Sequence, residues 1–227
     1  MPAPRTAWTL VAALAALLVP TPSPAASQCS SGDGYTYVGL ESASRANGIA
    51  ATISSVSLPR VEGGHAAAWI GVGGSGAGPN GADVWLQVGL SAFPGSPSAL
   101  YYELKLPGRA ARYVEIRRNV APRERHRLAV LELASRPGWW QVLVDGRPVA
   151  APVRLPGSHG AWEPIAVAES WDGGVGACNS YAYSFEGIAL ATAPGDWHPI
   201  AESYVLQDPG YRIVRRGGMS FLATSRS

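Results

Sequence analysis

Hydrophobic positions in this chain recur mostly at every second residue, the period of a β-strand with two different faces. Runs of about five to eight residues carry the pattern between Gly, Pro, Asn or Asp, and no stretch beyond the N-terminal region has a helical period. These runs predict strands at 48–57, 66–72, 84–90, 100–106, 113–118, 127–133, 139–144, 149–155, 165–171, 181–189, 211–214 and 219–223.

The turn signals between the runs indicate antiparallel pairing. Asp145–Gly146 separates 139–144 from 149–155 and is typical of a tight type I′ hairpin, so these two strands should pair. About twelve strands without an obvious linker favour a single all-β domain of residues 28–227, a jelly-roll sandwich of two antiparallel sheets. The short runs within 191–227 should complete the same sandwich, because a separate domain of that size would have too little core.

Three strands carry polar residues in otherwise apolar surroundings: Gln87 in "WLQVGL", Glu103 in "YYELKL" and Glu169 in "AVAESW". Alternation turns Gln87 away from the apolar face of its strand, beside Trp85 and next to Gly89. Since Gly89 has no side chain, we expect open space above the strand at this point.

The two glutamates differ in how clearly the pattern places them. Glu103 shares a face with an aromatic residue and a lysine, whereas alternation does not decide which face of the Glu169 strand is buried. An acid among apolar and aromatic neighbours has a raised pKa, which suits general acid or base chemistry. The glycine-rich segment 73–82 lacks a phosphate-binding pattern and is interpreted as a loop over one end of a sheet or as a flap.

Charge excludes one class of partner. The chain has 227 residues with 18 basic and 16 acidic side chains, and its Arg-rich segment 123–127 is interrupted by Glu124. No basic stripe for phosphates results, so we expect no nucleic-acid partner.

The N-terminus predicts export. Residues 1–27 combine an arginine, a short apolar run ended by proline and small residues, as in a secretory signal peptide cleaved near Ala26 to Gln28. We expect a secreted, extracellular monomer with no membrane association after cleavage. Cys29 and Cys178 would then form one disulfide, the alternative being two free thiols.

The remaining chemistry depends on carboxylates and amides. There is no G-x-S-x-G motif, and the four histidines, at 65, 126, 159 and 198, lack ligand spacing, so we expect no metal and no other cofactor.

Four short segments occur in the order, and nearly the spacing, found in the eqolisins, the family of glutamic peptidases. They are "AWIGVGG" at 68–74, "WLQVGL" at 85–90, "YYE" at 101–103 and "AES" at 168–170. The chain thus resembles a bacterial, secreted eqolisin over about 48–190. The resemblance implies a concanavalin-like sandwich with a substrate groove across its concave face.

The resemblance also implies roles for individual residues. Gln87 and Glu169 match the catalytic pair of an endopeptidase for protein or peptide substrates active at acidic pH, with Glu169 as base and then acid and Gln87 as oxyanion donor. Trp69, Trp85 and Glu103 match or flank groove positions. Gly73 and Ser91 stand where family members usually carry acids, so the groove here is poorer in carboxylates.

Two other functions are compatible with the same fold. An exported, non-catalytic concanavalin-like module could bind carbohydrate or another surface polymer through tryptophans. A glycosidase would need two suitably spaced carboxylates, which Glu103 and Glu169 could supply.

Overall fold

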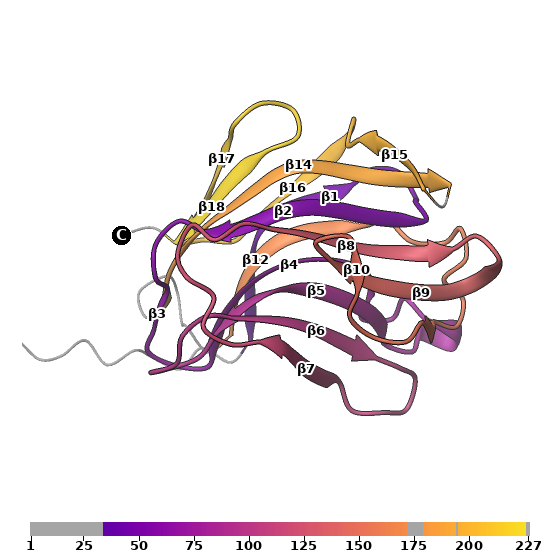
Figure 1. The fold of residues 1–227 in the computed structure, drawn as a ribbon, viewed down its shortest axis with the longest axis horizontal. Helices are drawn as coiled ribbons and strands as arrows, with labels where there is room; N and C mark the ends of the chain where they lie inside the picture. Colours follow the sequence, from indigo (N-terminus) through magenta and orange to yellow (C-terminus); the bar gives the residue numbers. More distant parts are fainter. Residues whose placement is uncertain (1–33, 172–178, 194, 226–227) are drawn as a thin grey trace, which may run out of the picture.

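The computed structural model describes residues 34–171, 179–193 and 195–225, and within these ranges it consists of strands and one short 3₁₀ turn, η1 (Pro79–Gly81). Two large sheets pack face to face (Figure 1). All strand pairs are antiparallel, so the prediction of an all-β sandwich of two antiparallel sheets is confirmed.

The first sheet has seven strands. Figure 1 shows β4 to β7 following one another in the lower half of the view. Its order is β16 (Ser203–Gln207), β1 (Tyr35–Ser42), β12 (Ile165–Trp171), β4 (His65–Gly74), β5 (Val84–Ala92), β6 (Ala99–Lys105) and β7 (Arg112–Arg117).

The second sheet has nine strands. Its main path is β10 (Arg147–Pro148), β9 (Arg136–Val144), β8 (His126–Leu133), β2 (Gly48–Ser55), β14 (Ala182–Ala193), β18 (Phe221–Ser225) and β17 (Tyr211–Arg215). β11 (Val153–Arg154) pairs with β9, β15 (Asp196–Pro199) pairs with β14, and a separate pair joins β3 (Arg60–Val61) to β13 (Asn179–Ser180). Strands from the C-terminal region therefore join both large sheets.

The core lies between the sheets, where β2 and β8 contact β4 and β5. Val84, Leu86, Val88 and Leu90 are each fully buried in it, as the alternation in β5 predicts. Trp85, Gln87 and Ser91 consequently face the outer side of the seven-stranded sheet. The sequence pattern thus fixes which side chains this outer surface presents.

The predicted hairpin is present but short. Asp145 and Gly146 have φ values of 51° and 76°, as a type I′ turn requires, and Arg147 pairs with Val144. The expected strand 149–155 is replaced by the short β10 and β11. The strand is interrupted between β10 and β11, with Pro148 and Pro152 at the two ends of the interruption. Neither proline has an N–H to donate to a hydrogen bond with the neighbouring strand.

Two strands of the first sheet were not predicted. β1 lies between β16 and β12 inside that sheet, and β16 forms its edge. β1 does alternate, with Val38 and Leu40 in the core, but it follows a Gly- and Ser-rich stretch that contains no strand signal. β1 forms one wall of the candidate site, so the strands predicted from the sequence lack that wall.

Candidate active site

The outer face of the seven-stranded sheet carries a groove of about 360 Å³. All five residues proposed from the sequence line it: Trp69, Trp85, Gln87, Glu103 and Glu169. The remaining lining residues are Tyr35, Tyr37, His65, Ala67, Val72, Gly73, Gly74, Ser75, Ser91, Phe93, Tyr101 and Tyr113.

Strand register sets the arrangement along the groove. Glu169 of β12 lies opposite Ala67 of β4, which lies opposite Ser91 of β5. Gln87 lies four residues before Ser91 on β5 and opposite Glu103 of β6. Gln87 and Glu169 therefore face the same groove from different rows of the sheet, and between them the described residues show no direct hydrogen bond.

The floor between these rows is apolar. Trp69 of β4 packs with Ala67, Tyr101 and Val167 in a small cluster separate from the main core. Both faces of β12 are therefore buried, Ala166 and Ala168 against the other sheet and Val167 in the floor. This double burial is why alternation alone could not place Glu169.

Glu169 is the more deeply placed member of a close contact with His65. It is only 5% exposed, and its Oε1 lies 3.3 Å from Nε2 of His65 at the start of β4. The imidazole side chain is 20% exposed and the carboxylate 7%, so His65 stands nearer the open groove. Sequence reasoning missed His65 because its strand was taken to begin at Ala66, although His65 falls on the same alternating face as Ala67 and Trp69.

Gln87 is held by a tyrosine. Its Nε2 donates to Oη of Tyr101 at 3.1 Å, and both side chains are buried. The Tyr101 ring stacks on Tyr113 of β7 with centroids 5.1 Å apart. One N–H of the amide is thus engaged, and the other remains for a group in the groove.

Glu103 has the perturbed acidity that an acid among aromatic neighbours should have. Burial raises the pKa of its carboxyl, a hydrogen bond from Trp85 Nε1 at 2.9 Å partly opposes that rise, and the charge of Glu169 adds to it. Burial also raises the pKa of the Tyr101 hydroxyl, and the charges of Glu169 and Glu103 raise it further. Tyr101 therefore remains a neutral phenol at any pH at which either glutamate acts as an acid or a base.

Ser91 and Gly73, where members of the resembling family usually carry acids, both line the groove. The Ser91 hydroxyl is 2.9 Å from Oη of Tyr113, so a neutral pair replaces a carboxylate here. Within the described ranges, Glu103 and Glu169 are the only carboxylates among the lining residues.

The prediction of open space above Gly89 is wrong. A Cβ at this position would lie 2.1 Å from the carbonyl oxygen of Ala68 and 2.7 Å from Cβ of Trp69. Gly89 therefore permits a close approach of β4 to β5 beneath the groove rather than clearance above it.

We expect Gly89→Ala to lower the free energy of unfolding by about 3 kcal/mol, because the atoms that the new methyl group meets belong to a neighbouring strand. Chemical denaturation measures this. Gly74→Ala is the matched control: a Cβ there meets nothing within 4 Å, so its effect should stay within about 1 kcal/mol. Equal effects of the two changes would contradict the close-approach interpretation.

Several expectations concern features outside this groove. Cys29, Cys178 and the signal segment lie outside the described residues. Within the described ranges, no group of three or more potential metal ligands occurs, and no helix is long and apolar enough to cross a membrane.

Comparison with known proteins gives two kinds of result. No family model and no curated protein matches the sequence. Among solved structures, scytalido-glutamic peptidase with a peptide-based transition-state analog aligns with a TM-score of 0.55 at 12% identity, covering 86% of this chain and all of that one. SCP-B, a member of the eqolisin family in complex with the tripeptide Ala-Ile-His, aligns with a TM-score of 0.52 at 13% identity, covering 85% and 98%. This shows a shared fold. The architecture expected from the eqolisin resemblance is therefore present, and the chemistry must be argued from the groove itself.

Proposed function

We propose that this protein is a secreted, monomeric glutamic-type endopeptidase that hydrolyses peptide bonds with Gln87 and Glu169, without a metal or other cofactor. The observation that carries the proposal is that both side chains line one groove on the outer face of the sheet, and neither points into the core between the sheets. Solved structures of the same fold hold a tripeptide and a peptide-based transition-state analog, which supports a peptide as the occupant.

The proposed reaction uses one water and returns every group to its starting state. Ionised Glu169 accepts a proton from the water as the water oxygen bonds to the peptide carbonyl carbon. The carbonyl electron pair moves to oxygen, where the N–H of Gln87 that Tyr101 does not engage donates to the oxyanion. The C–N bond then breaks, and Glu169 passes its proton to the leaving amine.

Burial of the pair suits these roles. Gln87 is 8% exposed and Glu169 5%, so both act where water is largely excluded and electrostatic interactions are stronger than in bulk solvent. Trp69 and its apolar neighbours form the floor under the scissile bond, and Trp85 holds Glu103 at the Gln87 end.

Digestion of a denatured protein across about pH 2 to 7, the range in which glutamate titrates, tests the proposal. The wild type should produce fragments, most efficiently at acidic pH, and Glu169→Gln and Gln87→Ala should not. Equal cleavage by the wild type and both variants, or no cleavage by any of them, would rule the assignment out.

A further inference from the structure

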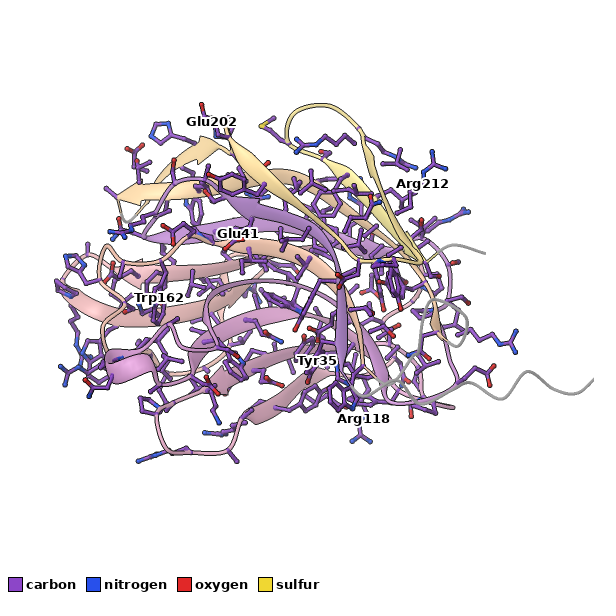
Figure 2. The ribbon with its side chains drawn as sticks, turned by 180° about the vertical axis from the view of Figure 1, so that it is seen from behind. Tyr35, Glu41, Arg118, Trp162, Glu202 and Arg212 are labelled. Carbon is purple, nitrogen blue, oxygen red and sulfur yellow. The ribbon has the colours of Figure 1, made fainter. Side chains whose placement is uncertain are left out.

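Aromatic rings form a continuous row across four neighbouring strands at one end of the groove. Tyr35 of β1 is paired with Trp171 of β12, which is paired with His65 of β4. Phe93 follows directly after Ala92, the last residue of β5, which pairs with Ala66 next to His65. We call these four side chains the aromatic row. Figure 2 labels Tyr35, which lies where β1 begins.

The rings of the row touch one another. The centroid of Tyr35 is 4.5 Å from that of Trp171 and 5.9 Å from that of His65, and His65 is 5.7 Å from Phe93. Tyr113 extends the contact beyond Phe93, with centroids 5.8 Å apart at an edge-to-face angle. Contacts in this range are favourable for aromatic pairs and keep the rings in place before a ligand arrives.

The row lies beside the proposed catalytic acid. On the same four strands, the residues two positions away from the aromatic row are Tyr37, Glu169, Ala67 and Ser91. They form a neighbouring row of the sheet about 7 Å from the aromatic row. His65 belongs to the aromatic row and also contacts Glu169. Along β5, Phe93 lies beyond Ser91 on the side away from Gln87, so the aromatic row extends the groove past the Glu169 end.

Part of this aromatic surface faces solvent. Tyr35 is 48% exposed, Phe93 39% and Tyr113 37%. Large rings that gather at the end of a groove and remain exposed mark a surface for an apolar ligand group. Among the described residues, those that line the groove include no lysine or arginine.

We infer that the aromatic row is a specificity subsite that receives a large apolar or aromatic side chain of the peptide substrate, next to the bond that is cleaved. This inference rests on the proposed function, since it takes Glu169 as the position of the reacting bond. The row supplies ring faces and edges, and the contact between His65 and Glu169 fixes its distance from the chemistry.

Cleavage of a matched peptide pair tests the subsite. We expect the wild type to prefer a peptide with Phe over one with Ala at a fixed position beside the cleaved bond, and Phe93→Ala and Tyr35→Ala to reduce the Phe/Ala ratio of kcat/KM by about tenfold. A purely structural defect would lower both rates equally and leave the ratio unchanged. Tyr204→Ala is the matched control, because Tyr204 on β16 is 64% exposed and does not line the groove. An unchanged ratio in both groove variants would overturn the inference while leaving the peptidase assignment intact.

A binding measurement separates the two proposals. The Glu169→Gln variant should bind a fluorescein-labelled octapeptide with central Phe more tightly than its Ala counterpart, and adding Phe93→Ala should remove the difference. If the wild type cleaves nothing but this preference is present, the subsite stands and the endopeptidase assignment fails. Binding of cellohexaose in place of either peptide, lost on Phe93→Ala, would overturn the inference in favour of a carbohydrate site.

Discussion

Replacing Glu169 with glutamine is expected to lower kcat for peptide hydrolysis by about 1000-fold, with little change in KM. Glutamine has nearly the same shape but cannot accept the proton of the attacking water. The contact of Glu169 with His65 allows an amide oxygen in the same place, so the groove should keep its form. Steady-state kinetics with an internally quenched peptide give kcat and KM separately.

A second buried glutamate provides the control for this experiment. Glu132 of β8 is 1% exposed, bonds Asn47 and the backbone N–H of Gly138, and lies 3.0 Å from Nδ1 of His159, outside the groove. Glu132→Gln should lower the stability to unfolding but leave kcat unchanged at temperatures where the variant is folded. If Glu169→Gln retained more than about a tenth of the wild-type kcat, Glu169 would not be the proton acceptor.

Two strands of the groove, β5 and β6, are those that alternation predicts best. In β5 and β6, one face is apolar throughout and packs against the second sheet, so the outward direction of Gln87 and Glu103 follows from the sequence. All five predicted site residues line the groove, but alternation does not account for Glu169, since both faces of β12 are buried.

What the sequence could not supply is the order of strands across the sheet. Pairing of β1 with β12 brings Tyr35 next to Trp171, although the two residues are 136 positions apart in the sequence. Alternation assigns faces but not neighbours, so a row of rings drawn from four separate strands has no local signature. The role of Gly89 was hidden for a related reason, because the close approach that it permits involves β4 and not its own strand.

The second large effect should come from Gln87. We expect Gln87→Ala to reduce kcat by about 100- to 1000-fold, the usual cost of removing one oxyanion donor, with KM nearly constant. An amide that bound the ground-state carbonyl equally well would instead change KM alone. A rise in KM at unchanged kcat would therefore assign Gln87 to substrate binding and not to catalysis.

Tyr101→Phe provides a graded version of that test. The hydroxyl of Tyr101 accepts a hydrogen bond from Nε2 of Gln87, and removing it frees the amide to rotate without removing the amide itself. We therefore expect a smaller loss in kcat, about tenfold, with the ring packing against Tyr113 preserved. Because Tyr101 acts only through the Gln87 amide, which Gln87→Ala already removes, the double variant Gln87→Ala with Tyr101→Phe should be no slower than Gln87→Ala alone. Additive losses would mean that Tyr101 acts on the substrate directly, and the orientation of Gln87 would then need another source.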